Sequence, residues 1–229
     1  MLEARARTEE QMDAADLDPS VYARVLNDLA RANTITMARR PTLAFLDRVV
    51  RRSGGALRIL DVGFGDGDML RRIAAWARAR RQPVELVGID LNPRSSDVAK
   101  AATPANLAID YRTGDYQALG KEPWDVIVSS LVAHHMTHGQ LIAFLRFMDA
   151  HARRGWFIND LHRHGFAYLG YPLLARLAGW HRIVREDGQL SIARSYRPHE
   201  WPPILAEARV GAARVFRTFP FRLCVEAIR

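Results

Sequence analysis

Short apolar runs alternate with amphipathic segments through most of the chain. The apolar runs predict strands at about 57–62, 84–90, 107–112, 124–129 and 154–159. Between them, apolar residues at helical spacing predict helices at about 67–80, 94–101 and 139–150. Such alternation is typical of a mostly parallel sheet with helices on both faces, so the predicted fold class is α/β.

The two ends of the chain depart from this alternation. From Pro19 to about Arg52, apolar residues at helical spacing predict two or three helices before the sheet, and Asp18 is a suitable N-terminal cap for the first. Further along, 166–180 is predicted to be helical, 181–197 irregular, 197–201 the possible start of another helix, and 212–219 and 221–228 strands. We therefore predict one domain, with an N-terminal helical cap at 1–52, an α/β domain at 53–229 and an insert at about 161–200.

A glycine-rich turn follows the first predicted strand. The segment from Leu57 to Asp68 reads Leu-Arg-Ile-Leu-Asp-Val-Gly-Phe-Gly-Asp-Gly-Asp. Glycine at every second position permits positive φ angles and lets a flat polar ligand lie against the main chain. The dinucleotide pattern Gly-x-Gly-x-x-Gly does not match, because the third glycine comes one residue early. Carboxylates at Asp66 and Asp68 would also repel a pyrophosphate at the start of the next helix.

Three later segments extend this pattern. The predicted strand Val84–Asp90 ends in an acid that is placed to accept both hydroxyls of a ribose. With the glycine motif Asp61-Val-Gly-Phe-Gly-Asp-Gly67, the chain resembles the class I S-adenosylmethionine-dependent methyltransferases. The other matching motifs, in order, are Asp90-Leu91-Asn92, Thr113-Gly-Asp115-Tyr116 and Trp124-Asp-Val-Ile-Val-Ser-Ser130.

The resemblance implies a Rossmann-like, seven-stranded, mostly parallel sheet whose last strand is antiparallel, with S-adenosyl-L-methionine as the cofactor. Asp61 and the glycine backbone would hold the methionine end, Asp90 the ribose, and Asp115 would face the adenine amine. The full set of cofactor-binding residues that it implies is Asp61, Gly63, Gly65, Gly67, Asp90, Leu91, Asp115, Tyr116 and Ser130.

Two histidines follow the fourth predicted strand, where the carboxyl end of a parallel strand opens onto the ligand crevice. His134 and His135 are therefore expected near the reactive methyl group. Imidazole titrates near neutral pH and suits a base that accepts a phenol or alcohol proton. The alternative is that one of them packs or hydrogen-bonds to the cofactor carboxylate.

The fifth strand ends in Asn159-Asp-Leu-His-Arg-His164, also on the crevice side. Methyltransferases of small phenolic or polyketide-like molecules have a similar run, which makes Asp160 and Arg163 candidates to contact substrate or to orient a catalytic histidine, and His162 a further catalytic candidate. For Arg163 and His164 the alternative is a surface loop without a role. Tyr168 and Tyr171 in the insert are candidates for an aromatic substrate pocket. Aromatic residues at helical spacing are also typical of a core.

Composition excludes several classes of protein. No cysteine pair or His-Glu-x-x-His pattern indicates a metal site, and we predict none. Cys224 is the only cysteine, which fits a reducing compartment and a packed thiol. No apolar run is long enough for a membrane span or signal peptide, so the expected location is cytoplasmic. The net charge of +8 comes from arginines spread along the chain, which favours solvated helix faces over a nucleic-acid stripe.

The function predicted from these observations is methyl transfer to a hydroxyl of a small aromatic or polyketide-type acceptor, as in secondary metabolism, by a monomer or homodimer. A C- or N-methyltransferase of a small molecule is the closest alternative. A nucleic-acid methyltransferase is a second, although Ser129-Ser-Leu-Val replaces the Asn/Asp-Pro-Pro-aromatic motif of enzymes that act on exocyclic amines. A cofactor-binding regulator without catalysis is a third.

Overall fold

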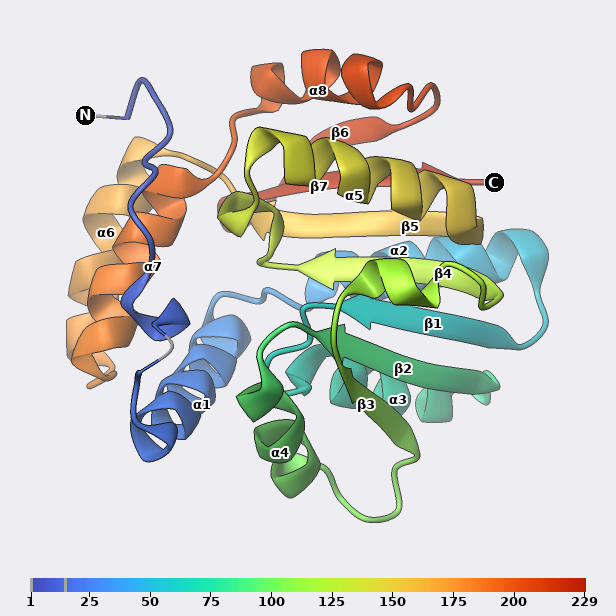
Figure 1. The fold of residues 1–229 in the computed structure, drawn as a ribbon, viewed down its shortest axis with the longest axis horizontal. Helices are drawn as coiled ribbons and strands as arrows, with labels where there is room; N and C mark the ends of the chain where they lie inside the picture. The colour runs from blue at the N-terminus through green and yellow to red at the C-terminus, as the bar shows by residue number, and fades with distance from the viewer. Residues whose placement is uncertain (1, 15) are drawn as a thin grey trace.

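A seven-stranded sheet with helices on both faces forms the centre of the computed structural model, which describes residues 2–14 and 16–229 (Figure 1). The strand order is β3-β2-β1-β4-β5-β7-β6. Strands β1 to β5 pair in parallel, and β7 is antiparallel to both β5 and β6. The strands are β1 (Leu57–Val62), β2 (Val84–Asp90), β3 (Ile109–Thr113), β4 (Trp124–Ser130), β5 (Ala152–Leu161), β6 (Arg214–Thr218) and β7 (Arg222–Ile228). The predicted α/β fold with an antiparallel last strand is confirmed.

The helices occupy three places around this sheet. One face is covered by α5 and α8, and the other by α2, α3 and α4, because each helix directs apolar residues at the strands. The third group, α1, α6 and α7, packs together beyond the carboxyl ends of the parallel strands. The α-helices are α1 (Pro19–Ile35), α2 (Arg40–Ser53), α3 (Asp68–Arg80), α4 (Pro93–Ala102), α5 (His138–His151), α6 (Gly165–Leu177), α7 (Arg182–Arg194) and α8 (Trp201–Ala208). The short 3-10 helices are η1 (Gln11–Asp13), η2 (Tyr116–Leu119), η3 (Ala133–His135) and η4 (Pro198–Glu200).

The two N-terminal helices pack in different places. The Asp18 carboxylate caps α1 by accepting hydrogen bonds from the backbone N–H groups of Ser20 and Val21, as predicted. Helix α1 packs against α6 and α7, whereas α2 buries Phe45 and Leu46 against the sheet. Of the helices expected to form a cap within residues 1–52, only α1 therefore lies over the strand ends.

Helix α7 corrects the prediction that residues 181–197 are irregular. Gly188 lies in its middle and weakens the helical pattern in the sequence. In the structure this glycine brings α7 close to α6, since a Cβ atom on it would overlap the Tyr171 ring. Packing between the two helices therefore outweighs the low local propensity.

Cys224 lies in β7 and is completely buried. Burial raises the pKa of its thiol to about 12, so the packed thiol expected from the sequence is present. No helix among the described residues has the length and apolar character needed to cross a membrane.

Candidate active site

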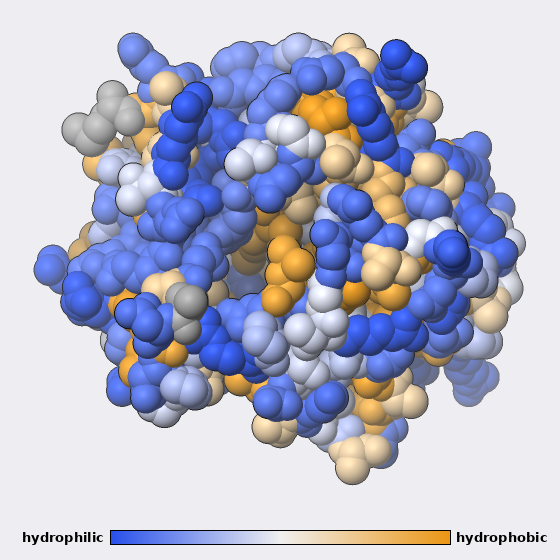
Figure 2. Space-filling model, viewed as in Figure 1, coloured by the Kyte–Doolittle hydropathy of each residue, from blue (hydrophilic) through white to orange (hydrophobic). Residues whose placement is uncertain are grey.

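A cavity of about 640 Å³ opens at the carboxyl ends of the parallel strands. Its walls come from the turn after β1, the ends of β2 and β4, helix α1, the α6–α7 pair and the N-terminal segment. Figure 2 shows the surface hollowed near the centre of this face, with hydrophobic side chains at its edge. Ligand crevices of open α/β sheets form at this end of the strands, so the topology itself places the site.

The glycine turn lies on the floor of this cavity. Gly63, Gly65 and Gly67 have φ angles of 77°, 56° and 76°, a conformation that other residues rarely adopt. A Cβ atom on Gly65 would meet nothing closer than 3.8 Å, so its main chain faces the open space. Gly67 differs, because it caps α3 and a Cβ atom there would overlap the Tyr111 hydroxyl. Gly67 therefore shapes the turn without lining the cavity.

Asp61 is buried beneath this turn and borders a small adjoining cavity of about 60 Å³. Its Oδ1 atom has no hydrogen-bond partner among the described residues. Burial, with smaller effects from Asp90 and Asp68, raises the pKa of this carboxyl to about 8. A buried acid without a partner is suited to a ligand that brings an ammonium group or another donor.

Asp90 ends β2 and lines the main cavity. Its carboxylate accepts hydrogen bonds from the backbone N–H groups of Gly65 and Asn92, both at 2.9 Å. Burial raises the pKa of Asp90 despite these bonds. Leu91 stands at the cavity wall with 73% of its surface exposed, and the buried Ser130 hydroxyl has no partner within the described chain.

Asp115 and Tyr116, the two residues predicted on the adenine side, have different surroundings in the structure. Tyr116 lines the cavity and packs edge-on against Phe144 and Phe147. Asp115 is exposed instead, and its carboxylate caps η2 by accepting a hydrogen bond from the Gln117 N–H at 2.9 Å. Asp115 therefore does not line the cavity in this structure.

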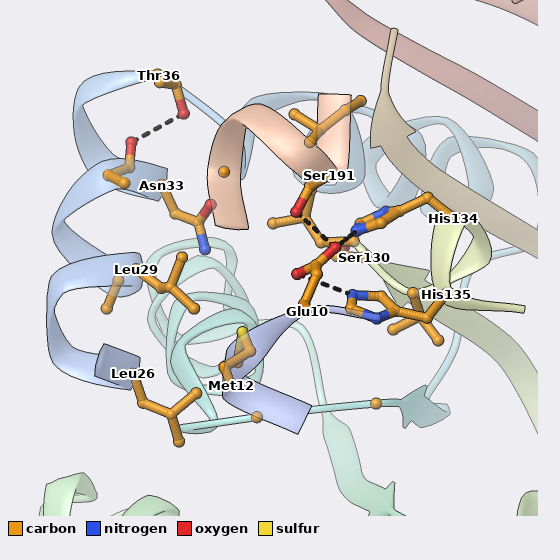
Figure 3. A pocket seen from close by; sticks show the side chains of 18 of the residues that line it. Glu10, Met12, Leu26, Leu29, Asn33, Thr36, Ser130, His134, His135 and Ser191 are labelled. Atoms are coloured by element: carbon orange, nitrogen blue, oxygen red, sulfur yellow. Dashed lines mark hydrogen bonds and ion pairs between the residues drawn. The ribbon is translucent and has the colours of Figure 1, made fainter. Parts of the chain in front are cut away.

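His134 is buried between the carboxylates of Asp160 and Glu10 at the other end of the cavity, and Figure 3 shows its contact with Glu10. Its Nδ1 atom lies 2.6 Å from Asp160 Oδ1, and its Nε2 atom lies 3.5 Å from Glu10 Oε1. Burial alone lowers the pKa of this imidazole, but Asp160 and Glu10 outweigh it and raise the pKa to about 9. His134 is therefore an imidazolium at neutral pH.

His135 is more accessible and lines the same end of the cavity. Its Nδ1 atom lies 3.0 Å from Asp13 Oδ2, and its Nε2 atom lies 3.8 Å from Glu10 Oε2. About 27% of the side chain is exposed, against 2% for His134. The shorter contact with Asp13 favours a proton on Nδ1, and Nε2 is the nitrogen on the side of Glu10.

Glu10 and Asp13, which complete this cluster, are residues that the sequence analysis missed. They come from the N-terminal segment, which α7 holds by two kinds of contact. The Ser191 hydroxyl donates to Glu10 Oε1 at 2.8 Å, and the Asp187 carboxylate accepts from the backbone of Gln11 and Met12 at 3.1 and 2.9 Å. No local motif marks these acids, since their partners lie more than 120 residues away.

One donor atom from each of Glu10, His134 and His135 lies within 4.8 Å of the other two. This spacing allows a metal ion as well as a hydrogen-bonded network. The Arg194 guanidinium approaches Glu10 Oε1 to 4.0 Å and already supplies positive charge there. The absence of a metal stays a prediction.

Comparison with known proteins identifies the class of domain. Residues 59–155 match a family model described as "Methyltransferase domain". Residues 59–155 are therefore similar to methyltransferase domains, and the sheet has the class I methyltransferase fold. A comparison with curated proteins finds no significant match.

Solved structures of methyltransferases share this fold. The plantazolicin methyltransferase BpumL, in complex with a pentazolic desmethylPZN analog and SAH, has a TM-score of 0.67 and 14% identity, over 91% of this chain and 91% of that one. Human N-acetylserotonin methyltransferase in complex with SAM has a TM-score of 0.63 and 16% identity, over 93% of this chain and 56% of that one. The citrinin polyketide synthase CMeT domain has a TM-score of 0.60 and 14% identity, over 83% of this chain and 52% of that one.

Similar solved methyltransferases are in complex with SAM or SAH, and the strand ends of this protein have groups that fit S-adenosylmethionine. The buried Asp61 carboxyl, which lacks a partner on Oδ1, fits an ammonium group, and Asp90 is placed for ribose hydroxyls. The open backbone at Gly65 can lie against the ligand. The charge and shape of the strand ends are therefore suited to the cofactor.

Three residues expected to act on substrate lie outside the cavity lining. Arg163 is fully buried, forms an ion pair with Glu200 at 2.6 Å and so joins the end of β5 to η4. His162 has a pKa lowered to about 4, first by burial and then by the nearby His164. Tyr168 does not line the cavity, whereas Tyr171 does and donates its hydroxyl to the Val184 carbonyl at 3.0 Å. Asp160 reaches the cavity only through His134.

Proposed function

We propose that the protein transfers the methyl group of S-adenosylmethionine to a hydroxyl of a small aromatic or polyketide-type molecule. One observation carries this proposal: the accessible imidazole of His135 lines the same cavity as Asp90 and the glycine turn. A proton acceptor and the groups suited to the cofactor therefore share one cavity. Met12, Leu29 and Ile192 add apolar surface to the wall, which suits an aromatic acceptor.

The bound cofactor would supply the activated methyl group, and the protein has to align the acceptor and remove its proton. Asp61 is proposed to hold the methionine ammonium and Asp90 the ribose. We assign the base to His135, because Asp13 occupies Nδ1 and the more distant Glu10 contact, at 3.8 Å, leaves Nε2 as the nitrogen to take the hydroxyl proton. His134 already carries a proton at neutral pH, and its pairs with Asp160 and Glu10 position the cluster.

The test is an assay with S-adenosylmethionine and a panel of phenolic acceptors, with mass spectrometry of the products. His135→Gln is expected to lower the methylation rate by about 10²- to 10⁴-fold, the usual contribution of a positioned base. Binding of S-adenosylhomocysteine, measured by calorimetry, should change little. The matched control is His138→Gln, since His138 is an exposed histidine paired with Glu207 outside the cavity.

Three results would count against this function. An unchanged rate in His135→Gln would remove the base from the proposal. Products methylated at carbon or nitrogen would replace the hydroxyl acceptor with the corresponding alternative, and structural analysis of the product distinguishes the three. No binding of S-adenosylhomocysteine at millimolar concentration would contradict every enzymatic version.

A further inference from the structure

Arg222 is a buried cation at the wall of the active-site cavity. It begins β7, and its backbone pairs with Leu161 at the carboxyl end of β5. Only 3% of its surface is exposed, yet it lines both the main cavity and the small adjoining one that contains Asp61. Its position is therefore at the junction of the region suited to the cofactor and the region left for an acceptor.

The guanidinium of Arg222 lacks the partners that a buried charge needs. Its Nη2 atom donates to Thr36 Oγ1 at 3.2 Å, whereas Nε and Nη1 have no partner within the described residues. Burial lowers the pKa of this group to about 10, which still leaves it charged at neutral pH. An unpaired buried charge destabilises a fold, so its retention points to an occupant.

The other two buried arginines of the described residues each have a carboxylate or several carbonyl partners, although the Nε atom of Arg163 also lacks one. Arg163 pairs with Glu200 at 2.6 Å. Arg194 donates to the backbone carbonyls of Thr8, His134 and His135. Asp160 is the acid that most raises the pKa of Arg222, but its carboxylate is hydrogen-bonded to His134. Arg222 differs from both, because within the described residues its guanidinium has neither a carboxylate nor a carbonyl partner.

We propose that Arg222 binds the carboxylate of a ligand in this cavity. The flat guanidinium presents N–H groups in a fork that matches two carboxylate oxygens. Apolar Leu161 and Phe221 line the cavity beside it, which suits an organic acid better than a phosphate needing many donors. The carboxylate has two possible sources: an aromatic acid that serves as acceptor, or the methionine half of the cofactor. The first source extends the proposed function and rests on it, whereas the second does not.

Binding measurements on full-length Arg222→Met distinguish the two sources. Calorimetry would compare S-adenosylhomocysteine with 5′-methylthioadenosine, which lacks the amino-acid carboxylate, and 4-hydroxybenzoate with its neutral amide. A cofactor source predicts that the variant loses about 10- to 100-fold affinity for S-adenosylhomocysteine and none for 5′-methylthioadenosine. If the carboxylate belongs to the acceptor, the variant should lose this affinity for 4-hydroxybenzoate and keep its affinity for the other three ligands.

Controls separate binding from folding. Arg72→Met removes an exposed arginine on α3 and should leave all four affinities unchanged. Without ligand, Arg222→Met should melt at the same or a higher temperature, because a buried charge is removed. Arg222→Lys keeps the charge without the fork and should show a smaller loss. If neither carboxylate ligand loses affinity relative to its neutral counterpart, the proposal is overturned, whether or not any acceptor is methylated.

Discussion

Asp61 and His134 are buried ionisable residues whose pKa values are both raised, for different reasons. Burial raises the pKa of Asp61 to about 8, so that this acid is mostly neutral at pH 7. Two carboxylates raise the pKa of His134 to about 9, so that this base is charged. One residue lacks a partner and the other has two. Asp61 thus lies at one end of the site without a partner among the described residues, whereas His134 at the other end already belongs to an ion cluster.

Asp61→Asn should stabilise the ligand-free protein more at pH 8.5 than at pH 4.5. The unfolded carboxyl ionises near its ordinary value, whereas the folded one stays protonated up to about pH 8, so stability falls as pH rises across that interval. At pH 8.5 the variant should gain at least about 1 kcal/mol, a rise of about 2–4 °C in melting temperature at this size.

The same substitution should lower the affinity for S-adenosylhomocysteine by about tenfold or more, since the proposed partner of its ammonium group is gone. Scanning calorimetry at both pH values and a binding titration measure the two effects. Asp97→Asn, at an exposed position on α4, is the control and should change neither. A stability gain that is equal at both pH values would contradict the raised pKa of Asp61.

Glycine 188 shows how a single residue determines the packing of two elements. Gly188→Ala should destabilise the protein by about 1 kcal/mol or more, although alanine is the better helix former, because the new methyl group would overlap the Tyr171 ring. Gly139→Ala on α5 is the matched control, with open space around the new atom and an expected gain of about 0.5–1 kcal/mol. Urea unfolding of both variants measures this, and a gain in both would show that α6 and α7 tolerate separation.

Helix α7 holds the part of the N-terminal segment that carries Glu10 and Asp13. Asp187→Ala removes the acceptor for the Gln11 and Met12 backbone N–H groups, so Glu10 and Asp13 should lose their fixed places beside the histidines. We expect faster hydrogen exchange in residues 8–14 and a KM for the acceptor raised about tenfold, with little change in cofactor affinity. Arg182→Ala, an exposed position on the same helix, is the control. Unchanged exchange in this segment would contradict the role given to Asp187.

At the scale of the whole molecule, the parts predictable from the sequence are those built by local contacts. The glycine turn and Asp90 lie within one βαβ unit, where their spacing and apolar strands predict both the turn and the acid at the strand end. Glu10 and Arg222 could not be predicted in this way. Glu10 meets His134 across 124 positions of the chain, and Arg222 meets Thr36 across 186. Only the assembled sheet and cap bring them to one cavity.

The cavity wall is built from several elements, so cofactor binding should stabilise all of them. S-adenosylhomocysteine at 100 times its dissociation constant should add about 2.7 kcal/mol to the free energy of unfolding. At this chain length that corresponds to a rise of about 5–10 °C in melting temperature. Because α1 and the glycine turn line one cavity, exchange protection should extend from the β1–α3 turn into α1. Adenosine lacks the amino-acid half and should protect less, and protection confined to the turn would show that α1 is not a wall of the cofactor site.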